Sequence, residues 1–89
     1  MKKKTTYSKA QKETIKNAIK VSINSGYEQY VYEEENGDFT FGRLYNGCII
    51  GCHNVKRIVG VVINGTFYDY EQSKTICDNK LKNTIISWQ

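Results

Sequence analysis

The residues that come nearest to a metal-binding pattern are two cysteines and a histidine, Cys48, Cys52 and His53, with Cys77 further along the chain. Three thiolates and one imidazole are a common ligand set for tetrahedral zinc. On one strand, however, Cys48 and Cys52 would lie about 13 Å apart and His53 would point to the other face, since the rise is about 3.3 Å per residue. Only a bend at Gly51 would gather them, and free cysteines are more often buried as apolar groups. The sequence therefore predicts no metal site.

No arrangement of residues in the chain is typical of an enzyme. His53 is the single histidine, and a hydrolytic triad would have to place it beside a nucleophile and a carboxylate. The chain contains no nucleophile elbow, phosphate-binding glycine loop, His-Glu-x-x-His helix or dinucleotide fingerprint. We therefore expect a protein that is not an enzyme and that needs no cofactor.

Acidic residues around one predicted turn are the first candidate for a contact with a partner. They are Glu33, Glu34, Glu35 and Asp38. At the end of a hairpin they could meet a basic protein surface or a divalent cation, although a solvated turn is the simpler interpretation. Residues 1–20 carry seven lysines against one glutamate, and residues 27–45 carry five acids against one arginine. Such separation of charge favours a binding protein.

Cations and aromatic residues give the alternative, a nucleic-acid-binding surface. The cations of this surface would be Lys9, Lys12, Lys16, Lys20, Arg43, Lys56 and Arg57. Unpaired bases would stack on a strand face that carries Tyr30, Tyr32, Phe39 and Phe41. These aromatic residues are also needed as core in so short a chain, and the acidic hairpin would repel phosphate. Nucleic-acid binding is therefore the second hypothesis.

The element that positions the lysines is an amphipathic helix over residues 8–25. Positions i, i+3, i+4 and i+7 place on one face Ile15, Ala18, Ile19 and Ser22, with the lysines on the other side. Ser8 followed by Gln11 fits a capping box at the start. Gly26 follows, where a left-handed residue would end the helix.

Three Asn-Gly dipeptides, which begin at Asn36, Asn46 and Asn64, separate stretches rich in Tyr, Phe, Val and Ile. Asn-Gly is the preferred pair for the two-residue type I′ hairpin loop, because both residues tolerate positive φ. We therefore expect an antiparallel β-meander of five or six strands over residues 27–71. With the helix packed on this sheet, the fold class is α+β.

The register of the first hairpin decides where its aromatic residues lie. A two-residue loop at Asn36-Gly37 pairs Tyr32 with Phe41 and Tyr30 with Arg43. One face would then hold Tyr30, Tyr32, Phe39, Phe41 and Tyr45. The same loop opposes Glu35 to Asp38, and a longer, bulged turn would relieve that repulsion. A shift of one residue would break up the aromatic face.

Residues 58–63 are apolar on both faces, which predicts a central strand that is covered on each side. The helix covers one face, so the C-terminal segment, residues 72–89, or a second subunit must cover the other. In that segment Ser73 could cap a short helix with Ile76, Cys77, Lys80 and Leu81 inward, and residues 84–88 resemble a last strand. We expect a homodimer whose interface contains Ile85, Ile86 and Trp88.

The chain has 89 residues and a net charge of +4, which suits one domain, with residues 1–6 as a flexible basic arm. It shows neither a signal-peptide pattern nor a long apolar run, and its three cysteines are an odd number, so we expect reduced thiols in the cytoplasm and no membrane contact. A composition rich in Lys, Asn and Ile and free of Pro suits a phage or mobile-element product. The sequence thus predicts a small protein that inhibits or modulates a host protein by stoichiometric binding.

Overall fold

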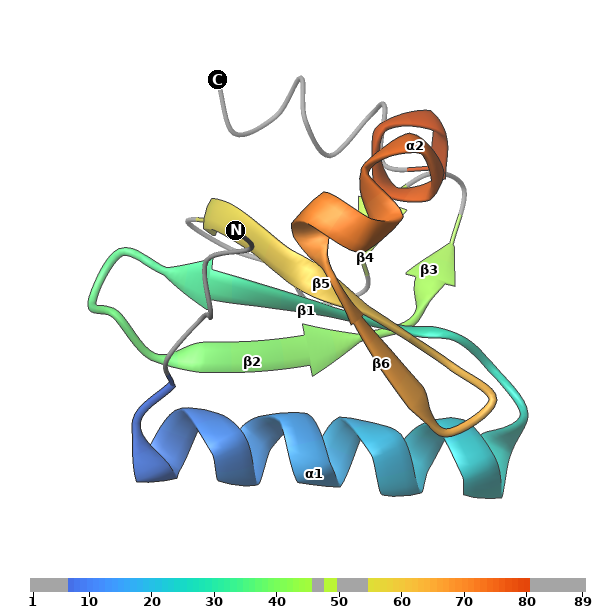
Figure 1. The fold of residues 1–89 in the computed structure, drawn as a ribbon, viewed down its shortest axis with the longest axis horizontal. Helices are drawn as coiled ribbons and strands as arrows, with labels where there is room; N and C mark the ends of the chain where they lie inside the picture. Colours follow the sequence, from blue (N-terminus) through green and yellow to red (C-terminus); the bar gives the residue numbers. More distant parts are fainter. Residues whose placement is uncertain (1–6, 46–47, 50–54, 81–89) are drawn as a thin grey trace, which may run out of the picture.

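A four-stranded antiparallel sheet lies between two helices in the computed structural model of the chain (Figure 1), which describes residues 7–45, 48–49 and 55–80. The fold class is therefore α+β. The strands of the sheet follow the order β2-β1-β5-β6, and β3 pairs with β4 in a separate two-stranded sheet. In chain order the elements are α1 (Lys9–Ser25), β1 (Gln29–Glu34), β2 (Phe39–Gly42), β3 (Leu44–Tyr45), β4 (Cys48–Ile49), β5 (Val55–Ile63), β6 (Thr66–Asp69) and α2 (Tyr70–Lys80).

Helix α1 has the limits that its sequence predicts. The hydroxyl of Ser8 accepts the backbone N–H of Gln11 at 3.1 Å, and the N–H of Ser8 donates to Gln11 Oε1 at 2.9 Å. Gly26 ends the helix with φ 78°, a left-handed conformation that glycine adopts without steric cost. The helix buries its apolar side against one face of the sheet, where the core consists of Ile15, Ala18, Val31, Phe39, Val59 and Val62.

The β1–β2 hairpin differs from its predicted register by one residue. Tyr32 pairs with Thr40 and Val31 with Phe41, so Phe41 lies on the α1 face and Tyr32 on the opposite face. The predicted face shared by Tyr30, Tyr32, Phe39, Phe41 and Tyr45 is therefore wrong. The physical reason is the turn, which has a three-residue loop with a left-handed glycine instead of the two-residue loop.

Strand β5 is one of the two inner strands, and its residues 58–62 are buried on both faces, as predicted. Its pairs Val31↔Gly60 and Tyr32↔Ile58 leave Val59 as an extra residue, a β-bulge that turns Val59 toward α1 and Ile58 to the other face. A Cβ atom on Gly60 would lie 2.2 Å from the carbonyl oxygen of Tyr68. The close pairing of β5 with β6 therefore accepts only glycine at this position.

Helix α2 covers the second face of the sheet. Its Cys77 is buried in a core cluster with Tyr30, Tyr32, Ile49, Val55, Ile58 and Val61. Its start is fixed by Asp69, whose carboxylate accepts the N–H of Gln72 at 2.8 Å and whose N–H donates to Gln72 Oε1 at 3.1 Å. This capping box repeats that of α1.

The start at Asp69 corrects the predicted C-terminal helix. Ser73 lies inside α2 at a kink instead of capping it, and its hydroxyl donates to the carbonyl of Asp69 at 2.7 Å. Cys77 points inward as predicted, but Ile76 and Lys80 are exposed, and Leu81 is outside the described residues. A helix that begins four residues earlier explains the difference, because its buried positions are then Ser73 and Cys77.

Two expectations about the sheet also change. The main sheet has four strands, not five or six, and it is not a meander, because β5 pairs with β1 rather than with β2. Asn64 and Gly65 link β5 to β6 with φ 49° and 82° between the paired residues Ile63 and Thr66. Asn46-Gly47 lies outside the described residues, so a fold joined by three Asn-Gly hairpins is not confirmed.

Because α2 covers the second face within one chain, the sheet itself gives no reason for a dimer. The predicted interface residues Ile85, Ile86 and Trp88 lie outside the described residues. The homodimer stays a prediction that light scattering of the full chain tests.

Candidate functional site

The turn between β1 and β2 holds its acidic residues in a defined conformation. The N–H of Gly37 donates to the carbonyl of Glu34, and the N–H of Glu34 donates to the carbonyl of Asp38, both at 2.9 Å. Gly37 has φ 92°, as expected for a three-residue loop that ends in a left-handed glycine. The amide oxygen of Asn36 accepts the N–H of Asp38 at 2.9 Å. These bonds fix the hairpin tip, which we define as residues 34–38.

The turn brings two acidic residues of the tip to directly opposed positions on the hairpin. The backbone bond from Glu34 to Asp38 places these residues opposite one another, so their side chains leave the same face of the hairpin. Like charges in this arrangement destabilise a sheet. Within the described ranges no cation pairs with Glu34, Glu35 or Asp38, and Asp38 Oδ2 accepts only the neutral Asn36 amide, at 3.2 Å.

Glu33, the fourth predicted acid, has a different role. Its Oε1 lies 2.5 Å from Nε of Arg57 on β5, and the guanidinium of Arg57 also lies 5.8 Å from the centre of the Phe39 ring. Glu33 and Arg57 therefore join β1 to β5 and neutralise each other. This pair was not expected, because it depends on the bulged register of β1 against β5.

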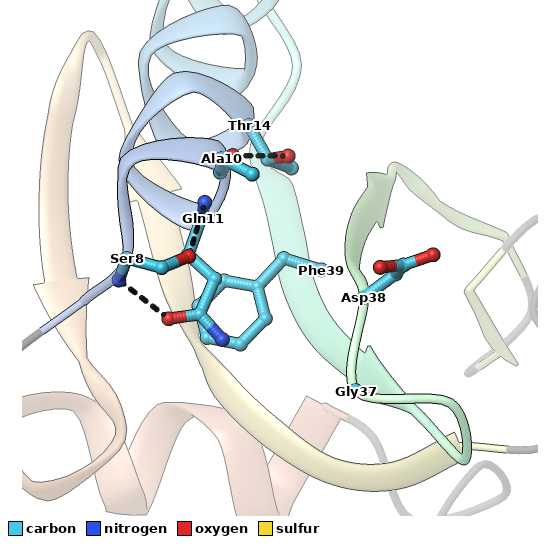
Figure 2. Close-up of a pocket in the computed structure, with 7 residues that line it drawn as sticks. All are labelled: Ser8, Ala10, Gln11, Thr14, Gly37, Asp38 and Phe39. Carbon is cyan, nitrogen blue, oxygen red and sulfur yellow. Dashed lines mark hydrogen bonds between the residues drawn. The ribbon is translucent and has the colours of Figure 1, made fainter.

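A hollow of about 310 Å³ separates the tip from the first turns of α1 (Figure 2). It is lined by Ser8, Ala10, Gln11, Thr14, Gly37, Asp38 and Phe39. Figure 2 shows the Phe39 ring directed toward the first turn of α1 and the Asp38 carboxylate directed away from the helix. The ring contacts Tyr7 edge to face, with 5.8 Å between centroids. The hollow thus has an aromatic floor that is part of the core, and the Asp38 carboxylate beside it faces away from the helix.

A second group of titratable side chains lies under α2. Burial, and then a hydrogen bond to Glu28, raise the pKa of Tyr30. A hydrogen bond to Asp78, followed by burial, raises the pKa of Tyr70 to about 12. Burial also raises the pKa of the Cys77 thiol, although the hydrogen bond with Ser73 opposes it. All three groups are kept protonated at neutral pH, so this cluster suits packing better than nucleophilic chemistry.

The structure does not gather the predicted cations into one surface. All four lysines of α1 are exposed and Lys56 is exposed on β5, whereas Arg57 pairs with Glu33 and Arg43 lies over the Tyr27 ring at 4.4 Å. The predicted stacking face is also absent, because Tyr30, Tyr32 and Phe39 are buried. Of the predicted nucleic-acid site, the structure therefore keeps the exposed lysines of α1 but not the aromatic stacking face.

The possible metal ligands weighed in the sequence, Cys48, Cys52, His53 and Cys77, fall only partly within the described residues. Cys77 is buried at 1% exposure, and the described residues hold no group of three or more metal-ligating side chains. Cys52 and His53 lie outside those residues. Over the same ranges, neither helix has the length and apolar character needed to cross a bilayer.

Comparison of the chain with protein-family models, with curated proteins and with solved structures gives no match.

Proposed function

We propose that this chain is a small non-enzymatic binding protein that inhibits or modulates a host protein by stoichiometric contact, and that the hairpin tip supplies the contact. The observation that carries the proposal is the opposition of Glu34 to Asp38 without a cation from the described residues. A basic surface on a partner would relieve the repulsion between the two carboxylates.

The shape of the tip supports a preformed contact. The Glu34 to Asp38 and Gly37 to Glu34 backbone bonds fix the backbone of the tip, and the Asn36 side chain holds the Asp38 carboxylate in place before binding. A contact residue that is already ordered loses less conformational entropy when the partner binds. The fixed turn therefore favours recognition by position as well as by charge.

The expected chemistry of the partner follows from the donors that match two neighbouring carboxylates. Arginine presents a planar fork of N–H groups that binds carboxylates with two bonds. We therefore expect the partner to offer arginine, or lysine in a cluster, to the tip. Such charges at the edge of an interface act mainly on the association rate and on its dependence on salt.

The test is affinity capture from a nuclease-treated host lysate with three forms of the full chain. One is the wild type, one carries Glu34→Gln with Asp38→Asn, and one carries Glu13→Gln with Glu71→Gln. Glu13 and Glu71 are exposed acids on α1 and α2, so both variants change the charge by the same amount. We expect one protein to be retained by the wild type and the control and lost by the tip variant. Equal retention by all three forms would show that the tip is not part of the interface. If none of the forms retains a protein, the proposal is contradicted.

A further inference from the structure

The exposed lysines of α1 form a single row. Lys9, Lys12, Lys16 and Lys20 follow one another at intervals of three, four and four residues, and all are exposed. With 3.6 residues per turn and a rise of 1.5 Å, they lie within about 80° of the helix circumference and extend over about 16 Å. We call these residues the lysine row.

The row is not neutralised by the part of the molecule that the structure describes. None of the four ammonium groups pairs with a carboxylate there, since the two ion pairs join Arg57 to Glu33 and Lys80 to Glu28. Glu13 is the only acid in α1, and it is also exposed. The flank therefore carries a net positive charge that solvent alone screens.

The lysine row and the hairpin tip are separate surfaces. The hollow beside the tip is lined from α1 by Ala10, Gln11 and Thr14. By helical periodicity these positions lie on the flank of α1 opposite to the row. A polyanion on the row would therefore not be held against Glu34, Glu35 or Asp38.

We infer that the lysine row binds the phosphate backbone of duplex nucleic acid, a second interaction independent of the proposed protein contact. A straight line of point charges matches the regular charge of a duplex, which carries one phosphate for about every 1.7 Å of its axis. The row contains no arginine to read bases with two bonds, and Tyr30, Tyr32 and Phe39 of the predicted stacking face are buried, so the row contacts backbone without choosing sequence.

A membrane surface fits these observations less well than a duplex. Insertion of a helix into a bilayer interface needs a large apolar face beside its basic side. In α1 that face is packed on the sheet through Ile15 and Ala18, and Val21 and Ile23 are the large apolar residues of the helix that are exposed. The experiment therefore includes anionic vesicles as the competing ligand.

The experiment measures binding of the full chain to short fluorescent duplexes of two unrelated sequences over a range of salt. Four phosphate contacts predict a slope of log K against log salt of about −3.6, equal for both sequences. Lys12→Gln with Lys16→Gln should make the slope shallower by about 1.8, because two contacts are lost. Glu13→Gln should strengthen binding, since it removes the acid beside the row.

The control is Lys56→Gln with Lys74→Gln, which removes the same charge from exposed positions on β5 and α2. The slope should not change in this variant, and circular dichroism should show that all variants remain helical. If the slope becomes equally shallow in the two double variants, net charge alone is responsible for the binding and the inference is overturned. Binding to phosphatidylserine vesicles but not to the duplex would overturn it in favour of a membrane.

Discussion

The hydroxyl oxygen of Ser22 accepts the backbone N–H of Gly65 at 3.0 Å, across 43 residues of sequence. Ser22 lies near the end of α1 and is 2% exposed, and its own hydroxyl hydrogen goes to the carbonyl of Ile19 at 2.9 Å. Gly65 belongs to the turn between β5 and β6, where Ile23 also packs. Ser22 thus bonds the end of α1 to the turn between β5 and β6.

Ser22→Ala should therefore lower the free energy of unfolding by about 1 to 3 kcal/mol, because the N–H of Gly65 loses its partner in a part-buried site. Urea unfolding followed by circular dichroism measures the change. Asn17→Ala, at an exposed position of the same helix, is the control and should stay within about 0.5 kcal/mol. Similar values for both variants would mean that the bond contributes little.

Gly60→Ala should be the more damaging of two glycine substitutions. A methyl group at position 60 would meet the backbone of β6 at 2.2 Å, so the β5–β6 pair would have to separate. At Gly26 a Cβ has open space, and only the left-handed φ of 78° is unfavourable, at about 1 to 2 kcal/mol. Thermal unfolding should show a larger loss of stability for Gly60→Ala than for Gly26→Ala. The opposite order would contradict the register of β5 against β6.

Local sequence signals predicted the elements whose limits they determine. Ser8, Gln11 and Gly26 marked α1, and the apolar run of β5 marked a central strand. The hairpin register was not predictable in the same way, because Asn36-Gly37 fits both a two-residue loop and the observed three-residue loop. That choice moved Phe39 and Phe41 to the α1 face and placed Glu34 opposite Asp38.

At α2 the missed signal was present in the sequence. Asp69 followed by Gln72 has the spacing of a capping box, as Ser8 and Gln11 have. The bond between Glu33 and Arg57, in contrast, depends on how β1 and β5 are paired across a bulge. Such long-range pairing is set by packing of the whole sheet, and the sequence pattern of one strand does not contain it.

Glu34→Gln should raise the free energy of unfolding by about 0.2 to 1 kcal/mol, because it removes the repulsion between opposed carboxylates. Glu71→Gln is the matched change at an exposed acid away from the tip and should not stabilise the protein. Urea midpoints at low salt measure the difference, and added salt should reduce it. A loss of stability in Glu34→Gln would contradict the arrangement described for the tip.

Stability should fall as the pH rises above 10. Tyr70 has a pKa of about 12 in the fold against 10.0 when unfolded, so folding favours its protonated form. This contribution is complete below pH 10 and is lost as the pH rises toward 12. Tyr70→Phe should weaken the pH dependence in that window and should also lower stability at neutral pH, since the bond to Asp78 is lost. Unfolding curves of both proteins at pH 9, 10 and 11 measure this pH dependence. If stability falls with pH as steeply in Tyr70→Phe as in the wild type, Tyr70 is not the cause.

Native mass spectrometry of the material that the full chain retains from a nuclease-treated lysate shows whether the hairpin tip binds one partner protein. The spectrum should contain one complex that holds this chain and one partner protein in equal numbers, present for the wild type and for Glu13→Gln with Glu71→Gln. The same complex should be absent for Glu34→Gln with Asp38→Asn. A spectrum that contains only the free chain, or a complex that survives the tip variant unchanged, would contradict the claim that the hairpin tip binds a protein stoichiometrically.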